Sequence, residues 1–321
     1  MLNRTLSEMD GIVSRVNTHP EYSGCVAREK YHSLREEAAQ HSLDMELEAD
    51  ERHLSRSERR EFLKRIGDAE HFLAQNGVSM YSLSRLGHFI ESDSNSSGGF
   101  RNVEVSFGDF YGVNKETLHY QIRDLVDFLE ITPSHPVLRA AQAHVELVRI
   151  HPYGDGNGRV ARLLQNFCLQ QRNYPPAVIL AEDKKDYIQL MRNVLQDRVK
   201  GRGSLFDPST SETAFYQFVA DRVLASSLVL EQELKSKRIY HVELTKVSDP
   251  RIAGKISSFV RNFGRGPNSR GVSVKIDKKN GISRGDSLKV VGDISREDLN
   301  TVLEKSCGKY GVKFNVANKF C

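Results

Sequence analysis

Apolar residues in the middle of the chain recur every three or four positions, the spacing of one face of an α-helix. The clearest run is residues 136–150, and a second run begins near Gly158. Each predicts an amphipathic helix with a buried face. Pro152 and Gly154 should end the first helix, because proline cannot continue the hydrogen-bond ladder and glycine permits a sharp reversal. His151 is therefore expected at the end of a buried helix, at the mouth of a loop.

Helical patterns dominate the rest of the first 240 residues. Residues 1–75 are charged, poor in proline and helical in pattern, and residues 211–236 predict one long helix. Residues 103–107 alternate apolar and polar side chains, as a short strand does. Further helix breaks are expected at 132–133, 174–176 and 200–204.

The pattern changes after about residue 245, where strand-like alternation joins helical periodicity. The alternating segments are 272–276, 287–291 and 312–316, and the helical ones are 252–263 and 295–307. A basic glycine loop at 264–271 joins the first helical segment to the first alternating one. Ser295 is a suitable N-cap for the last helix. We expect three parts: a helical region at 1–75, a helical core at 76–240 and a small α+β domain at 246–321.

Charge separates the last part from the others. Residues 251–321 carry 15 Lys and Arg against 6 Asp and Glu, whereas residues 1–250 carry 31 against 36. A basic domain attracts phosphate and acidic surfaces. The basic charge of residues 251–321 therefore favours contact with nucleic acid, or with a protein such as a target, a regulator or a second copy of the chain. A structural appendage that is merely basic is the remaining interpretation.

Cysteine usage and apolar run lengths narrow the class of protein. The four cysteines are widely spaced and contain no Cys-x-x-Cys pair, so neither a disulfide framework nor a zinc site is indicated. The N-terminus shows no apolar signal region, and the longest apolar runs, such as residues 177–181, are too short to span a bilayer. A cytoplasmic protein is expected, with delivery into another cell left open.

Residues 151–162, His-Pro-Tyr-Gly-Asp-Gly-Asn-Gly-Arg-Val-Ala-Arg, gather the parts of a phosphate site. Backbone N–H groups of a tight glycine turn can converge on an anion, and the positive end of the following helix favours phosphate. Arg159 and Arg162 lie three residues apart on that helix and could chelate phosphate oxygens. Asp155, the acid of the loop, is a candidate ligand for a divalent metal. A plain surface turn with solvated arginines is the alternative, and the joint spacing disfavours it.

This stretch resembles the signature of the Fic (Fido) family, H-P-F-x-(D/E)-G-N-(G/K)-R-x-x-R, with Tyr153 in place of phenylalanine. Residues 98–101 resemble its G-x-(F/Y)-R segment, and residues 185–191 its helix along the nucleotide base and ribose. The resemblance covers roughly residues 75–200. It implies a mainly α fold with a Fido-type helical core and a small β-hairpin flap. The flap docks a target's backbone and is expected to include Val103, Glu104, Val105 and Ser106.

The resemblance also implies transfer of AMP from ATP to a Ser, Thr or Tyr hydroxyl of a target protein. His151 would be the general base and Asp155 the ligand of Mg²⁺. Arg159 and Arg162 would bind the β- and γ-phosphates, and Asn157 would join the loop N–H groups in an anion hole. The expected phosphate- or ATP-binding residues are Gly154, Gly156, Asn157, Gly158, Arg159, Arg162 and Tyr187. Glycine at 158, where the phosphorylating branch carries lysine, favours adenylylation.

Many family members inhibit themselves with a helix carrying (S/T)-x-x-x-E-(G/N), whose glutamate pairs with the second motif arginine. Ser33 and Glu37 have this spacing, although Ala38 departs from the pattern. A solvated, charged helix face is the other interpretation of that segment.

Two other functions stay open at this point. One is removal of AMP in the same pocket, and the other is a nucleic-acid-binding regulator that uses the domain as a nucleotide sensor. An intact His151 favours catalysis, because a sensor needs the phosphate cradle and not the base. The target, the choice among AMP, UMP and GMP, and the oligomeric state are not determined by the sequence.

Overall fold

The computed structural model describes residues 1–18, 25–49, 54–95, 98–131, 133–236, 238–245, 247, 249, 251–263, 272–279, 282–292 and 294–318. The predicted basic loop at 264–271 lies outside these ranges. The chain divides into two compact units: unit 1 comprises Met1–Ser14 and Tyr31–Leu228, and unit 2 comprises Arg15–Lys30 and Val229–Cys321.

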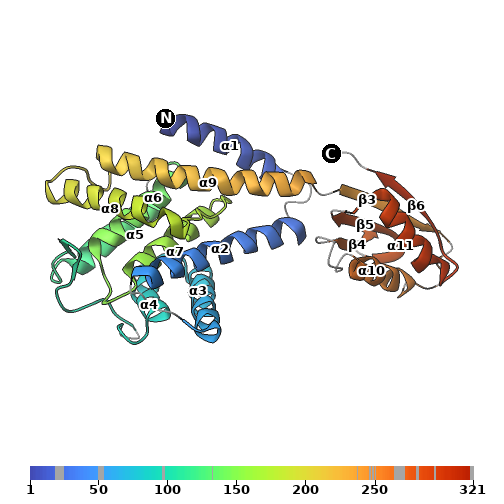
Figure 1. The fold of residues 1–321 in the computed structure, drawn as a ribbon, viewed down its shortest axis with the longest axis horizontal. Helices are drawn as coiled ribbons and strands as arrows, with labels where there is room; N and C mark the ends of the chain where they lie inside the picture. Colours follow the sequence, from blue (N-terminus) through green and yellow to red (C-terminus); the bar gives the residue numbers. More distant parts are fainter. Residues whose placement is uncertain are drawn as a thin grey trace. The chain divides into compact units, whose positions relative to one another are not determined.

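Most of the first 236 residues are helical, as the periodicity predicted (Figure 1). They are α1 (Leu2–Thr18), α2 (Cys25–Ala49), α3 (Arg56–Asn76), α4 (Met80–Ile90), α5 (Leu118–Ile131), α6 (Pro136–Ile150), α7 (Asn157–Gln170), α8 (Lys184–Val199) and α9 (Thr210–Ser236), with a 3₁₀ turn at Ala181–Asp183. None of the helices in the described part of the chain is both long and apolar enough to cross a membrane.

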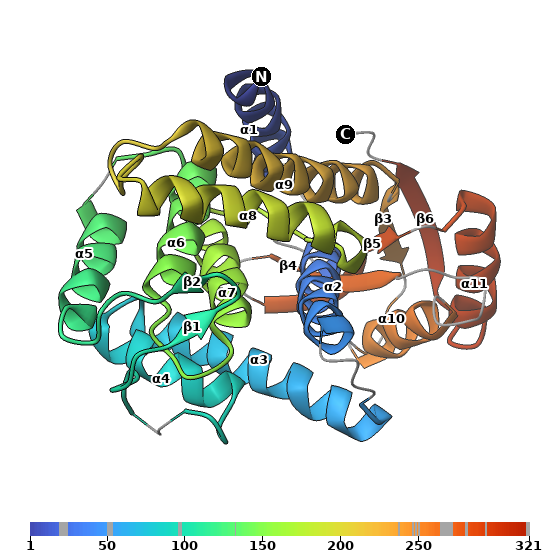
Figure 2. The same cartoon turned by 60° about the vertical axis from the view of Figure 1, so that its left-hand side comes forward.

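The α6–α7 pair forms the centre of unit 1 and carries the loop of interest (Figures 1 and 2). Eleven residues of α6 are buried, so this helix is enclosed on nearly every side. Its core partners include Met9 of α1, Leu43 of α2 and Leu73 of α3. Helices from residues 1–75 therefore share one hydrophobic core with the predicted catalytic region, which places α2 against α7.

The predicted strand at 103–107 is shorter than expected. Only Ser106–Phe107 (β1) is extended and paired, with Phe110–Tyr111 (β2) as its antiparallel partner. One further bond, from the N–H of Gly112 to the carbonyl of Val105 (3.1 Å), prolongs the hairpin. Val103 is 56% exposed and its carbonyl accepts a hydrogen bond from an arginine side chain. The segment before Val105 therefore has no strand partner, and alternation alone overstated its length.

Unit 2 confirms the predicted α+β character but begins its sheet earlier than residue 246. Its elements are β3 (Arg238–Thr245), α10 (Arg251–Phe263), β4 (Ser273–Lys279), β5 (Ile282–Gly292), α11 (Arg296–Gly308) and β6 (Lys313–Asn318). The antiparallel order is β4-β5-β3-β6, so β3 is an inner strand that the sequence analysis missed. Tyr240 and Val242 of β3 join both helices in one core, which leaves the opposite face of the sheet uncovered by them.

Candidate active site

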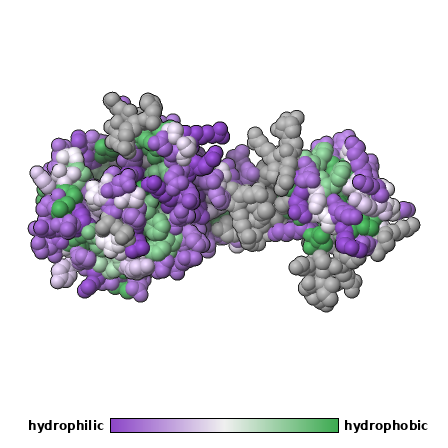
Figure 3. All heavy atoms as spheres, turned by 90° about the horizontal axis from the view of Figure 1, so that it is seen from below, coloured by the Kyte–Doolittle hydropathy of each residue, from purple (hydrophilic) through white to green (hydrophobic). Residues whose placement is uncertain are grey.

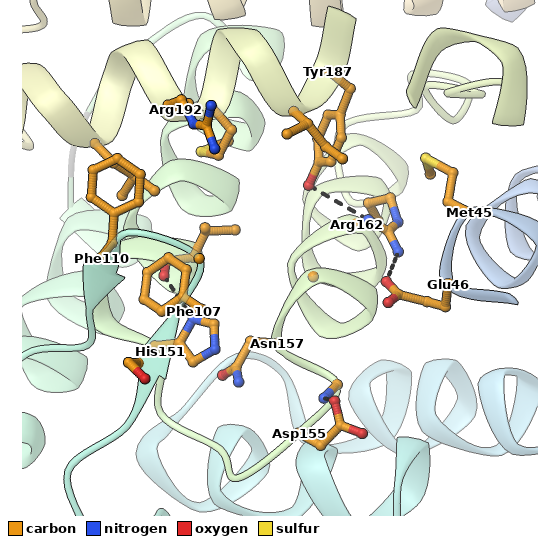
Figure 4. Close-up of a pocket in the computed structure, with 18 of the residues that line it drawn as sticks. Met45, Glu46, Phe107, Phe110, His151, Asp155, Asn157, Arg162, Tyr187 and Arg192 are labelled. Atoms are coloured by element: carbon orange, nitrogen blue, oxygen red, sulfur yellow. Dashed lines mark hydrogen bonds and ion pairs between the residues drawn. The ribbon is translucent and has the colours of Figure 1, made fainter. Parts of the chain in front are cut away.

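A cavity of about 640 Å³ opens where α6 ends and α7 begins (Figure 4). Six segments line it: the end of α6, the loop 154–158 with His151, the β1–β2 hairpin, α7, α8 and α2. The hairpin crosses in front of the end of α6 and the start of α7 (Figure 2). The predicted loop, helix and hairpin therefore meet at one site, to which α2 adds residues that were not predicted.

His151 lies at the wall of the cavity, and one of its ring nitrogens is engaged in a hydrogen bond. It ends α6 in a left-handed conformation (φ 53°), held by its N–H bond to the carbonyl of Leu147 (3.0 Å). Its Nδ1 lies 3.2 Å from the carbonyl oxygen of Val148, which can only accept, so Nδ1 carries the proton. Burial lowers the pKa of the imidazole to about 4. The histidine is therefore neutral at pH 7, and its Nε2 lone pair is the available base.

Two residues fix the orientation of this histidine. The ring of Phe107, on the hairpin, stacks on the imidazole with centroids 3.8 Å apart and planes 5° apart. The Arg101 guanidinium donates to the carbonyls of His151 (2.7 Å), Val103 (2.6 Å) and Val113. Arg101 thus ties the end of α6 to both sides of the hairpin, which gives a physical reason for arginine in the segment 98–101.

Asparagine side chains shape the loop. Asn157 donates to the carbonyl of Tyr153 and accepts from its N–H, each at 3.0 Å. The Asn95 amide oxygen accepts from Gly154 (2.9 Å) and Asp155 (3.4 Å). Both polar groups of the Asn157 amide therefore hold the loop, and the residue also lines the cavity. The amide nitrogen carries a second N–H, so its expected part in an anion hole stays a prediction. Asn95 was missed, since nothing in its serine-rich segment marked it.

Donors for an anion come instead from the start of α7. Gly156 has φ 83°, a conformation that favours glycine, and it turns the chain into the helix. The first ladder bond runs from the N–H of Val160 to the carbonyl of Gly156 (2.9 Å). The N–H groups of Asn157, Gly158 and Arg159 precede that ladder at the positive end of the helix dipole. These N–H groups are therefore the donors that the sequence predicted for an anion.

Tyr153 occupies the position where the signature has phenylalanine. Its side chain is 1% exposed, and its hydroxyl donates to the carbonyl of Leu83 at 2.7 Å. A Cβ on Gly87 would lie only 2.5 Å from the ring, so α4 approaches the tyrosine through a glycine. The hydroxyl has the partner that a buried tyrosine requires.

Asp155 presents a half-exposed carboxylate to the cavity. One oxygen accepts from the N–H of Gly156 (2.5 Å) and the other lies 3.3 Å from Nη2 of Arg159. Within the described residues, no group of three or more acidic, histidine or cysteine side chains could hold a metal by itself. A single exposed carboxylate beside an anion site does fit Mg²⁺, which keeps several waters and binds through one or two carboxylates plus phosphates.

The two motif arginines point to different places, contrary to the expectation of one shared face. Among the described residues that line the cavity, Arg162 is present and Arg159 is not. Arg159 is buried behind the loop, with Nη1 3.0 Å from Glu91 and its guanidinium 6.0 Å from the Phe62 ring. A direct role of Arg159 in binding the β-phosphate is therefore not favoured, and it holds the loop to α4.

Arg162 is held by α2, through residues other than those predicted (Figure 4). Its Nη2 lies 2.9 Å from Oε1 of Glu46, and its Nε donates to the hydroxyl of Ser42 at 2.8 Å. Ser33 and Glu37 are both exposed. The prediction for Ser33 and Glu37 was wrong because nine residues turn an α-helix by about two and a half turns, so Glu37 lies on the face opposite Glu46. Ser42 and Glu46 have the same spacing, followed by Leu47, and were overlooked.

Tyr187 of α8 lines the cavity, as expected, and links Arg162 to a buried histidine. Its hydroxyl lies 3.5 Å from Nη1 of Arg162 and 3.0 Å from Nε2 of His144. Burial lowers the pKa of His144 to about 3, so this histidine is neutral, and its Nε2 shares a hydrogen bond with the tyrosine hydroxyl. Arg162 donates to the oxygen of the same hydroxyl. From the sequence, His144 was placed only in the helical run.

Of the four predicted hairpin residues, only Ser106 is among the described residues that line the cavity. Ser106, Phe107 and Phe110 line the cavity, whereas Val103, Glu104 and Val105 are not among the described lining residues. Asp109, at the turn, lies 3.3 Å from Arg192 of α8. The hairpin therefore covers the cavity from the His151 side.

Comparison with known proteins agrees with this geometry. Residues 68–169 match the Fic/DOC family. The chain is 37% identical over 99 residues to the protein adenylyltransferase fic-1 of Caenorhabditis elegans, covering 30% of this chain and 20% of that protein. It is 38% identical over 100 residues to the protein adenylyltransferase Fic of Nematostella vectensis, covering 30% and 23%. The chain thus spans about a fifth of the length of these curated relatives.

Solved structures extend the similarity of fold beyond that segment. A Fic domain containing signalling protein from Bacteroides thetaiotaomicron superposes with a TM-score of 0.59 at 19% identity, over 72% of this chain and 97% of that one. Fic-1 from Caenorhabditis elegans superposes with a TM-score of 0.58 at 20% identity, over 73% of each chain. Residues 68–169, which supply the loop, the hairpin and α7 to the cavity, therefore carry the similarity to the Fic/DOC family.

Proposed function

We propose that this protein transfers AMP from ATP to a hydroxyl side chain of a target protein. The observation that carries the proposal is the neutral His151, with Nε2 available, beside the N-terminus of α7 in one cavity. The name protein adenylyltransferase, borne by the relatives of the matched segment, supports it. Because those relatives are about five times longer than the matched segment, their activity enters here as a proposal.

The reaction requires one proton transfer and one exchange at phosphorus. The target hydroxyl gives its proton to Nε2 of His151, and its oxygen forms a bond to the α-phosphorus of ATP. The bond between that phosphorus and the oxygen bridging to the β-phosphate breaks, and pyrophosphate leaves. The low pKa of His151 keeps the base unprotonated at neutral pH.

Phosphate binding is assigned to the start of α7 and to Arg162. The N–H groups of residues 157–159 would stabilise the charge on the α-phosphate, and Arg162 would chelate the terminal phosphate. Asp155 would hold Mg²⁺, which supplies charge neutralisation to bridging phosphate oxygens when bound. Gly154, Gly156 and Gly158 would let the loop backbone approach the phosphates.

The expected self-inhibition is reassigned from Glu37 to Glu46. In the resting chain the carboxylate of Glu46 pairs with Arg162 and lines the cavity. A terminal phosphate on Arg162 would compete with this carboxylate, since both are anions that bind the same guanidinium. Glu46 would thereby keep ATP from the productive pose, and Ser42 would hold the arginine in the paired position.

The test of the transfer is direct. The Glu46→Gly variant is incubated with Mg²⁺, ATP labelled at the α-phosphate and a cell lysate. Label should appear on protein and should be absent with the His151→Ala form of the same variant. Label of equal intensity in the His151→Ala form would contradict the role of the histidine. Repeating the reaction with the four labelled nucleotides identifies the transferred group.

A second candidate is removal of AMP from a target by the same site. The observation that favours it is the Glu46 carboxylate in the cavity wall, which could position a water for attack on the phosphorus. Wild-type protein should then release AMP from a labelled target, and Glu46→Gln should not. ATP binding without transfer or release in any variant would favour the nucleotide-sensor interpretation.

A further inference from the structure

The sequence of unit 2 contains a basic segment that the transferase chemistry does not use. Residues 251–276 contain six Lys and Arg and no Asp or Glu. Three of the six acids of residues 251–321 lie instead in α11, at Glu297, Asp298 and Glu304. Helix α10 falls wholly within the basic segment. The positive charge of this unit is therefore concentrated, and α10 presents part of it.

The two sides of α10 differ in kind. Ala253, Ile256 and Val260 are fully buried in the core of unit 2. On another side of the helix, Lys255, Phe259 and Phe263 follow one another at intervals of four residues, which makes them neighbours along a ridge. Phe259 is 49% exposed and Phe263 45% exposed. Folding of the unit thus leaves two phenyl rings at the surface beside a basic side chain.

A tyrosine after α11 adds to this ridge. The ammonium of Lys255 lies 5.6 Å from the centroid of the Tyr310 ring, and that of Lys309 lies 6.0 Å from it. These contacts hold both lysines near an aromatic face. We call Lys255, Phe259, Phe263, Lys309 and Tyr310 the α10 surface. Figure 3 shows hydrophobic residues of this unit as small patches within a mostly hydrophilic surface.

The face of the sheet away from the helices has a different composition. Lys275, Lys289 and His241 lie directly opposite one another across β4, β5 and β3. Among the described residues at outward positions of these three strands, none is Phe, Tyr or Trp. That face is basic without aromatic side chains of these types, whereas the α10 surface combines lysines with rings.

Lysines interleaved with exposed rings match single-stranded nucleic acid. Its phosphates attract the lysines, and its unpaired bases offer flat faces on which phenyl rings stack. A duplex hides those faces. A membrane surface would need the apolar stripe of α10, which the core of unit 2 already occupies through Ile256 and Val260. We propose that the α10 surface binds single-stranded nucleic acid through phosphate contacts and base stacking, without reading its sequence.

The experiment measures binding of the full-length chain to a fluorescent oligo(dT) of about 20 nucleotides, a length that spans at least one typical site. We expect Phe259→Ala to weaken binding about tenfold, since a lost stacking contact has that order of effect. Lys255→Gln should make the salt dependence shallower, by about 0.7 in the slope of log K against log salt. Phe206→Ala, which removes a phenyl ring 72% exposed in unit 1, is the matched control and should bind as wild type.

Three outcomes would overturn the proposal: no binding at low salt, equal binding by Phe259→Ala and wild type, or tighter binding to phosphatidylserine vesicles than to the oligonucleotide. Unchanged circular dichroism of each variant ensures that the loss is local. The His151→Ala variant should bind the oligonucleotide as wild type does. A failure of the transferase proposal and a failure of this one are thereby distinguishable.

Discussion

Replacing Glu46 with glycine should increase ATP-dependent labelling, because it removes the anion that pairs with Arg162. The carboxylate lies 2.9 Å from the guanidinium, and Arg162 also bonds Ser42 and Tyr187. After the substitution the guanidinium keeps those two neutral partners and stays in place. Its charge is then available to the terminal phosphate of ATP.

The size of the effect follows from the burial of the pair. The Arg162 side chain is 8% exposed, whereas that of Glu46 is 37% exposed. A hydrogen bond to a charged group contributes about 1.5–3 kcal/mol, and solvent near Glu46 places this one at the lower end. Since 1.4 kcal/mol corresponds to a factor of ten, we expect ATP to bind roughly tenfold more tightly. Glu46→Gln, which keeps a neutral acceptor, should give an intermediate gain.

Glu37→Gly is the matched control, because it makes the same chemical change on the opposite, exposed face of α2. Glycine within a helix costs about 1 kcal/mol relative to alanine in both variants. Glu46→Gly should lose about 1.5 kcal/mol more in urea denaturation, because it also removes the contact with Arg162. The assay compares initial rates of labelling and the Kd of ATP by calorimetry. Equal rates and equal ATP affinity for the two variants would refute the role assigned to Glu46.

Three further predictions concern groups around Arg162 and the base. The rate of labelling should be constant above about pH 5 and fall as pH decreases through about 4, because protonation removes the base His151; an inflection near 6.5 in a pH profile would contradict the effect of burial. The folded chain should lose stability as pH falls below 6.5, because His144 and His151 stay neutral when folded but protonate with a pKa of about 6.5 when unfolded. Each histidine should lower the free energy of unfolding by about 1.4 kcal/mol at pH 5.5. The measurement is the shift of the urea midpoint between pH 7.5 and 5.5. Tyr187→Phe should destabilise the chain by about 1–3 kcal/mol, because it leaves the buried Nε2 of His144 without its partner. The same variant should raise the KM for ATP more than it lowers kcat, and an unchanged KM would mean that the hydroxyl does not position Arg162.

Local features of this protein follow from the sequence alone. Helices α6 and α7 and the loop between them were predicted within a few residues, because apolar periodicity, proline and glycine act over a single turn. The same local rules placed His151 at a helix end and the N–H donors at the start of α7. The tyrosine at 153 was accepted on the condition that its hydroxyl had a partner, and the carbonyl of Leu83 supplies it.

Long-range placements needed the tertiary structure. The sequence offered two Ser-x-x-x-Glu segments on one helix, and only the packing of α2 against α7 decides that Glu46 meets Arg162. The sequence also offered two arginines three residues apart. Only the position of Glu91, at the end of α4, turns Arg159 away from the cavity. Each of these choices depends on which face of a helix meets a neighbour distant in the chain.

The same distinction explains the polar groups that were misassigned or missed. The amide of Asn157 was expected only to face a ligand, but it also holds the loop, and Asn95 holds that loop from 60 residues away in sequence. Strand β3 was missed because its value as an inner strand depends on β5 and β6, which come much later in the chain. Periodicity is a property of neighbouring residues and is written in the sequence. The partner of a charged or amide group is chosen by packing, in which distant segments compete for the same few hydrogen bonds.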